Sequence, residues 1–178
     1  RDGSIFTPAF ITMYMCRQSI RLAVVEKFNT VLSSKDEKLF DKFEDIKNYT
    51  SRHFKTDDVL KANEIVNSLH ICDPAVGSGH FLVSALNEII VIKAELGILA
   101  DEKGNNLNGY EIEIVNDELI ITDQQGNPVE YKLQSGKPLS KEVQRLQRTL
   151  FLQKQTIIEN CLFGVDINPK SVLICRLR

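Results

Sequence analysis

The chain has 178 residues, of which 43% are hydrophobic and 26% are charged, and its formal net charge at pH 7 is −2. This length and composition predict one soluble globular domain with a sizeable core. This net charge gives no sign of the basic surface by which an autonomous nucleic-acid binder contacts phosphates. No signal peptide or membrane-length apolar run occurs, which predicts a cytoplasmic protein with no membrane partner.

The cysteines are widely spaced and show neither Cys-x-x-Cys nor paired histidine spacing. This pattern favours buried free thiols over a zinc site or disulfides, and no metal site is predicted. The cysteines are Cys16, Cys72, Cys161 and Cys175. A first residue other than Met and a last residue inside an apparent helix suggest a segment of a longer chain.

The first predicted element is a helix that runs from Ala9 to Phe28. Thr7 is a suitable N-cap for it, and Pro8 suits its first position. By itself this stretch is as well explained by a capped helix without further meaning as by a binding motif.

Two further helices are predicted before residue 69. A Ser34-x-x-Glu37 capping box predicts the start of the second helix. Residues 48–55 are then a connection, and the third helix is expected to start near Thr56. The apolar face of the second helix consists of Leu39, Phe40, Phe43 and Ile46.

The stretch from Leu69 to Leu82 has a short apolar run, an acid, a proline and two glycines before helical spacing begins. It predicts a strand, a tight loop and a helix, with Pro74 ending the strand. Gly77 and Gly79 lack a Cβ, so a ligand can approach the backbone there and face the amides of the helix start. Loops at the carboxyl ends of parallel strands bind nucleotides in open α/β sheets.

The type of nucleotide follows from what this loop lacks. No Gly-Lys-Ser/Thr closes it, and no third glycine follows at the dinucleotide spacing, so neither a P-loop nor a dinucleotide fingerprint is present. The carboxylate of Asp73 could hold a cofactor with a cationic amino group.

The helix after the loop is expected to end at Gly97, and His80 is interpreted as a surface histidine in its first turn. Residues 101–140 predict an antiparallel insertion that projects from the sheet. A contact with DNA or a neighbouring domain and a purely structural role are both open. Its runs are Tyr110–Val115, Leu119–Thr122 and Val129–Leu133, with turns at Asn116-Asp117 and Gln125–Pro128.

A long helix from Ser140 to Asn160 is followed by a second buried strand that ends at Asp166. A carboxylate at the end of a second parallel strand can accept hydrogen bonds from both ribose hydroxyls of a nucleoside cofactor. Asp166 is therefore the predicted ribose ligand. Asp123 is a weaker alternative, because no helix follows it directly. Another helix is expected from Lys170.

Three stretches, in chain order, resemble motifs of the S-adenosylmethionine-dependent adenine-N6 DNA methyltransferases of bacterial restriction–modification systems, including fused restriction–methylation enzymes. They are Phe6-Thr7-Pro8, Asp73 to Phe81, and Val165 to Pro169. The resemblance implies an α/β, partial Rossmann-like methyltransferase fold. Residues 1–68 would be a helical amino-terminal extension, and residues 69–178 the cofactor-binding domain with a β-hairpin insertion at about 101–140.

The resemblance also implies S-adenosylmethionine as the cofactor. Thr7 and Pro8 would border its methionine moiety, and Asp73 with the loop to Gly79 would hold its amino and carboxylate end. Asp166 would bind ribose, and Ile167 would lie against adenine. The implied cofactor-binding residues are Thr7, Pro8, Asp73, Pro74, Ala75, Val76, Gly77, Ser78, Gly79, Phe81, Asp166 and Ile167.

Two features depart from the family pattern. The ribose acid normally follows the glycine loop by about 20 residues, whereas an insertion must separate them here. In addition, the sequence has no Asn/Asp-Pro-Pro-Tyr/Phe, the motif that grips a flipped adenine in this family. No catalytic residue is therefore predicted in this segment, which would bind cofactor at best.

The implied partner is double-stranded DNA, bound by a longer parent protein in the bacterial cytoplasm, with target-recognition and nuclease domains downstream. Two alternatives stay open. One is a methyltransferase that acts on RNA or protein, and the other is a noncatalytic nucleotide-binding or interaction module.

Overall fold

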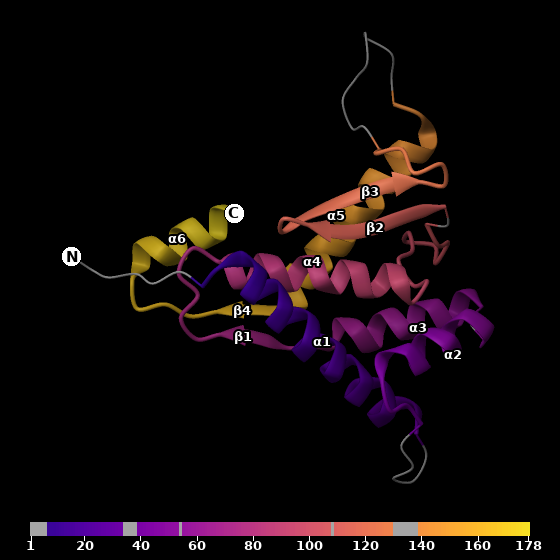
Figure 1. Ribbon diagram of the computed structural model, residues 1–178, viewed down its shortest axis with the longest axis horizontal. Helices are drawn as coiled ribbons and strands as arrows, with labels where there is room; N and C mark the ends of the chain where they lie inside the picture. The colour runs from indigo at the N-terminus through magenta and orange to yellow at the C-terminus, as the bar shows by residue number, and fades with distance from the viewer. Residues whose placement is uncertain (1–6, 34–38, 54, 108, 130–138) are drawn as a thin grey trace.

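The computed structural model describes residues 7–33, 39–53, 55–107, 109–129 and 139–178. Within these ranges the chain forms six helices and four short strands (Figure 1). The helices are α1 Ala9–Leu32, α2 Phe43–His53, α3 Thr56–Asn67, α4 His80–Glu95, α5 Lys141–Cys161 and α6 Pro169–Leu177. The strands are β1 Ile71–Asp73, β2 Tyr110–Val115, β3 Glu118–Asp123 and β4 Leu162–Gly164.

Helix α1 confirms the predicted start but not the predicted cap. Pro8 is the N-cap, no side chain caps the helix, and the carbonyl of Pro8 accepts the amides of Ile11 and Thr12 at 3.0 and 3.1 Å. Thr7 therefore lies one residue before the cap position, where its hydroxyl does not serve the first turn. Phe6 lies outside the described residues.

Helix α2 differs from the prediction at both ends. It begins at Phe43, because a carboxylate oxygen of Asp45 accepts the amides of Asp41 and Lys42, both at 3.0 Å. It then continues through most of the predicted connection. The expected capping box at residues 34–37 lies outside the described residues. The predicted start of α3 is confirmed at Thr56.

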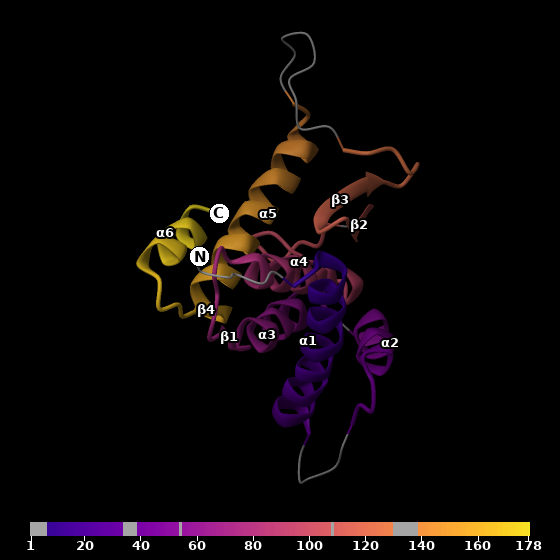
Figure 2. The same cartoon turned by 60° about the vertical axis from the view of Figure 1, so that its left-hand side comes forward.

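Helix α4 is the centre of the core. It packs against α1, α3 and α5, against β1 and β4, and against β2 of the hairpin. Ile89, Ile90 and Ile92 on it are fully buried. Its expected end is confirmed, since Gly97 follows it with a left-handed φ of +65°. The hairpin lies on one side of α4 and α3 on the opposite side (Figure 1 and Figure 2).

The strand predicted before the glycine loop and the strand predicted before Asp166 are neighbours in one sheet. β1 pairs with β4 in parallel, with Ile71 opposite Leu162 and Asp73 opposite Gly164. The pair continues past both strands, because the amide of Val165 donates to the carbonyl of Asp73 at 2.9 Å. Both strand ends, and the segments that follow them, therefore meet at one edge.

The insertion forms a hairpin as predicted, but it does not extend from the parallel sheet. β2 and β3 pair antiparallel as a separate sheet, and Asn116 and Asp117 both have positive φ, +52° and +66°, as a type I′ turn requires. Ile112 and Ile121 join the core that surrounds α4. The apolar face of the hairpin thus covers α4, because an exposed apolar sheet would cost hydration free energy. Residues 130–133 of the third expected run lie outside the described residues.

The long helix and the last helix agree with the prediction. Ser140 caps α5 by accepting the amide of Val143 at 3.2 Å, and Asn168 caps α6 by accepting the amide of Lys170 at 3.0 Å. Among the described segments, no helix combines the length and apolar character needed to cross a membrane.

Of the cysteines, Cys16 and Cys161 are buried as predicted. Cys72 is exposed and Cys175 is half-exposed, so the prediction is wrong for these two. Cys72 belongs to a two-stranded sheet, and such a sheet leaves more of its surface uncovered than the fully buried strand that its apolar neighbours predicted.

Candidate functional site

The candidate site is the edge where β1 and β4 end. The loop from β1 to α4 lies there beside the segment that joins β4 to α6 (Figure 1). The amide of Val76 donates to the carbonyl of Val165 at 2.9 Å, which ties the two segments together. The tertiary structure therefore assembles two of the three sequence motifs into one place.

The carboxylate of Asp166 is central to this edge. One oxygen accepts the amide of Gly77 at 2.8 Å, from 89 residues away in the chain, and the other accepts the amide of Asn168 at 2.7 Å. An ionised carboxylate has about four acceptor positions. The two hydrogen bonds leave acceptor capacity that two hydroxyl groups could use.

Asp73 lies at the start of the same loop. One of its carboxylate oxygens accepts the amide of Ala75 at 3.0 Å, which shapes the turn after the strand. Pro74 and Ala75 are exposed, and Ser78 is half-buried. A carboxylate beside exposed backbone is a suitable partner for an ammonium group.

The glycines let the loop adopt its path. Gly77 and Gly79 have φ of +52° and +83°, and a Cβ on Gly77 would have only the carbonyl of Ala75 within 4.0 Å. The space above Gly77 is therefore open to a ligand. At Gly79 a Cβ would lie 2.7 Å from the sulfur of Cys175, so this glycine permits close packing of α6 on the loop.

Substitution of Gly79 by alanine is expected to cost about 2 to 3 kcal/mol of stability, from left-handed backbone strain and overpacking together. Gly126→Ala is the matched control: its φ is +77°, close to that of Gly79, but no atom lies within 4 Å of its Cβ position. It should cost only about 1 kcal/mol. Urea unfolding measures both, and a Cys175→Ala change should remove the excess. Equal losses at the two glycines would contradict the close approach of α6.

The third motif lies at the start of α1. Thr7 and Pro8 are exposed there. Two turns further along α1, the thiol of Cys16 lies 3.8 Å from the carbonyl of Phe81 in the first turn of α4. Phe81 itself is half-buried and packs against the core. The structure thus brings α1 to the start of α4.

Ile167 and Asp123, the remaining predicted residues, have very different surroundings. Ile167 is fully exposed directly after Asp166. Asp123 closes a hairpin turn by accepting the amides of Gln125 and Asn127 at 2.9 and 2.8 Å, and the amide of Asn127 holds its pKa below the usual range. Asp123 belongs to the separate sheet of the hairpin, whereas Asp166 accepts a hydrogen bond from the glycine loop itself.

Neither a metal centre in the described part of the chain nor a reactive thiolate at Cys16 is found. No group of three or more His, Cys, Asp or Glu residues there could hold a metal ion. Burial raises the pKa of the Cys16 thiol to about 12, and the negative charges of Glu88, Asp117 and Asp73 add to this effect. Cys16 is therefore not a thiolate nucleophile at neutral pH.

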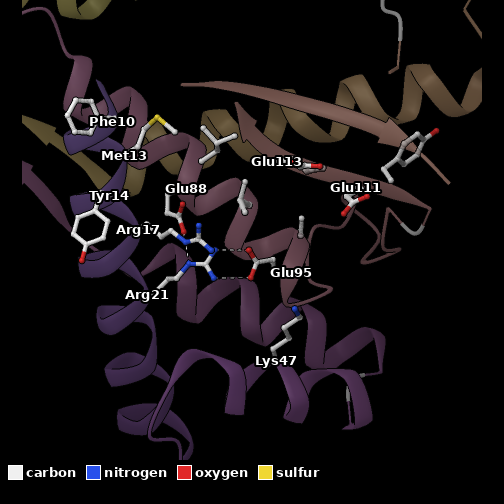
Figure 3. Close-up of a pocket in the computed structure, with 15 residues that line it drawn as sticks. Phe10, Met13, Tyr14, Arg17, Arg21, Lys47, Glu88, Glu95, Glu111 and Glu113 are labelled. Carbon is white, nitrogen blue, oxygen red and sulfur yellow. Dashed lines mark hydrogen bonds and ion pairs between the residues drawn. The ribbon is translucent and has the colours of Figure 1, made fainter. Parts of the chain in front are cut away.

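A larger groove of about 750 Å³ lies away from this edge, between α1, α4 and β2 (Figure 3). Its α1 wall presents Phe10 and Tyr14, which are 73% and 66% exposed, and the Arg21 ion pairs form part of its floor. This groove could not be predicted from the sequence, because α1 is apolar on several sides and its spacing does not separate core from surface. None of the predicted site residues lines it.

A smaller pocket, of about 410 Å³, lies behind the glycine loop. Val76 and Gly79 of the loop line it, together with apolar side chains of α4 and α6 such as Leu82 and Val172. Two arginines, Arg176 and Arg178, also line this pocket, and neither Asp73 nor Asp166 does.

Comparison with known proteins relates the chain to one class. It is 35% identical over 127 residues to a protein of Methanocaldococcus jannaschii that carries the name of a type II restriction enzyme and methyltransferase. The match covers 62% of this chain and 11% of that protein, so the chain spans a small part of its relative. The chain is therefore related to a protein named as both a restriction enzyme and a methyltransferase. No family model matches the chain, and no solved structure matches it.

Proposed function

We propose that this chain is the S-adenosylmethionine-binding part of a DNA methyltransferase of a restriction–modification system, which modifies N6 of adenine. The observation that carries the proposal is the hydrogen bond from the amide of Gly77 to Asp166 at the ends of two parallel strands. This hydrogen bond joins the glycine loop to a carboxylate that can accept hydrogen bonds from ribose hydroxyls. The name of the relative supports the same class of reaction.

The residues at this edge suit such a cofactor. Asp73 offers a carboxylate for its ammonium group, Gly77 offers open backbone, and Asp166 retains acceptor capacity for ribose hydroxyls. The exposed side chain of Ile167 offers an apolar surface for an adenine ring. Bound S-adenosylmethionine would supply an activated methyl group. We propose a partial Rossmann-like fold for residues 69–178 on the same grounds.

We further propose that the parent protein acts on double-stranded DNA in the cytoplasm, with target-recognition and nuclease parts elsewhere in it. The sequence lacks Asn/Asp-Pro-Pro-Tyr/Phe, so this chain alone should bind cofactor without transferring the methyl group. Incubation of the parent with labelled cofactor and duplex DNA should place the label on N6 of adenine. Label on RNA or protein instead would favour the alternative substrates.

Calorimetric titration with S-adenosylmethionine tests the site. The wild-type chain should show saturable binding that ATP and NAD do not displace. Asp166→Ala should weaken it by about 10- to 100-fold, the value of hydrogen bonds to a charged group. Asp123→Ala should leave it unchanged, because Asp123 ends a strand of the separate hairpin sheet and not one of the two parallel strands.

Each result leads to a different conclusion. A loss in Asp123→Ala rather than in Asp166→Ala would assign the ribose to the hairpin. If a folded wild-type sample shows no binding, the same titration is needed on the longer parent. If the longer parent also shows no binding, the cofactor assignment is rejected and an interaction module is favoured.

A further inference from the structure

The turn of the hairpin contacts the beginning of α4, directly after the glycine loop. His80, Ser84 and Asn87 lie on one face of α4 at helical spacing. The hydroxyl of Ser84 donates to the carboxylate of Asp117 at 2.7 Å, and the side-chain amide of Asn87 donates to the carbonyl of Asp117 at 2.9 Å. Nδ1 of His80 lies 3.5 Å from the other carboxylate oxygen.

These contacts are buried and specific to the turn. Ser84 and Asn87 are 2% and 6% exposed. Without the carboxylate of Asp117 the Ser84 hydroxyl would lose its partner where water cannot replace it, whereas Asn87 would keep the backbone carbonyl. The left-handed backbone of Asp117 is uncommon for a residue other than glycine. In this conformation both its carbonyl and its carboxylate bond to the same helix.

The start of α4 and the glycine loop form one hydrogen-bonded unit. The carbonyl of Gly79 accepts the amide of Val83 at 3.0 Å, and the amide of Gly79 donates to the carbonyl of Val76 at 2.8 Å. Val83 immediately precedes Ser84. A displacement of the first helical turn would therefore displace the loop.

We propose that Asp117 is a positioning residue, which clamps the start of α4 through Ser84, Asn87 and His80 and thereby holds the loop from Gly77 to Gly79 in its binding geometry. The inference rests on the proposed function for the identity of the ligand, S-adenosylmethionine. It gives the hairpin insertion a role in the site, although no hairpin residue belongs to the loop.

Hydrogen exchange of the backbone amides of residues 77–84 tests the clamp without any ligand. Asp117→Ala should speed this exchange by about tenfold, because it removes the buried hydrogen bond from Ser84 and the contact with His80. It should also weaken the binding of S-adenosylmethionine by about tenfold in a calorimetric titration. Asp117→Asn should restore both values to within about threefold, because its amide oxygen can accept from Ser84 and its carbonyl still accepts from Asn87.

Gly126→Ala is the matched control, because it strains the other turn of the hairpin and contacts no α4 residue. It should leave the exchange at residues 77–84 unchanged. Unchanged exchange in Asp117→Ala, or an equal increase in Gly126→Ala, would overturn the clamp. If exchange responds as expected but neither this chain nor the longer parent binds S-adenosylmethionine, the clamp stands and the proposed function fails.

Discussion

Replacement of Arg21 by methionine is expected to lower the free energy of unfolding by about 3 to 5 kcal/mol, because it leaves a buried carboxylate without its cation. Nε of Arg21 donates to Glu88 at 2.7 Å, and its other two guanidinium nitrogens donate to Glu95 at 2.9 and 2.7 Å (Figure 3). The side chain of Glu88 is only 5% exposed. Burial raises the pKa of Glu88 and Arg21 opposes that rise, so the variant should raise it further.

The matched control is Arg148→Met. Arg148 pairs with Glu102 at 3.3 Å, but these side chains are 73% and 60% exposed, so the loss should not exceed about 1 kcal/mol. Addition of Glu88→Gln to the Arg21 variant should recover most of the loss, since it removes the buried charge. Urea unfolding followed by circular dichroism measures all three. Equal losses from Arg21→Met and Arg148→Met would show that the buried pair contributes little.

The second large effect concerns Lys93, which is fully buried in α4. Its ammonium donates to amide oxygens of Asn67 and Gln153, both at 2.6 Å, and neither carries a charge. Burial lowers the pKa of Lys93 from 10.5 to about 8. The folded protein therefore releases this proton at a lower pH than the unfolded chain does.

The sign of the effect on stability follows from proton binding. Below pH 8 the ammonium is charged in both states, and the folded state bears the full cost of burying it. Between about pH 8 and 10.5 the unfolded chain binds the extra proton, so the contribution of Lys93 to stability rises with pH, by about 3 kcal/mol in total. The buried thiols act oppositely, because they ionise first in the unfolded chain.

Comparison of wild type with Lys93→Met isolates the lysine. The difference in free energy of unfolding, wild type minus variant, should rise by about 3 kcal/mol between pH 7.5 and 10.5. Lys61→Met, which removes an exposed lysine of α3, is the control and should retain the profile of wild type. A difference that stays constant with pH would mean that Lys93 is solvated in the folded state.

Several of these features could not be predicted from sequence. Arg21 and Lys93 lie in helices that are apolar on several sides, and the most distant partners of the two lie 74 and 60 residues away in the chain. Periodicity predicts that a side chain faces inward or outward, but it carries no information about which helix will face it. The same holds for Asp117, which the sequence marks as a turn residue and which the structure joins to Ser84.

The sequence by itself determined the local elements of the site: the strand, loop and helix that begin at Leu69, the hairpin turn at Asn116-Asp117, and the helices before and after the second strand. These depend on residues within a few positions of one another, where backbone geometry decides. Only the tertiary structure decided that Gly77 meets Asp166 across 89 residues, and that the hairpin covers α4. Such contacts require closure of a long loop, and burial of apolar surface in the assembled core decides which closure is stable.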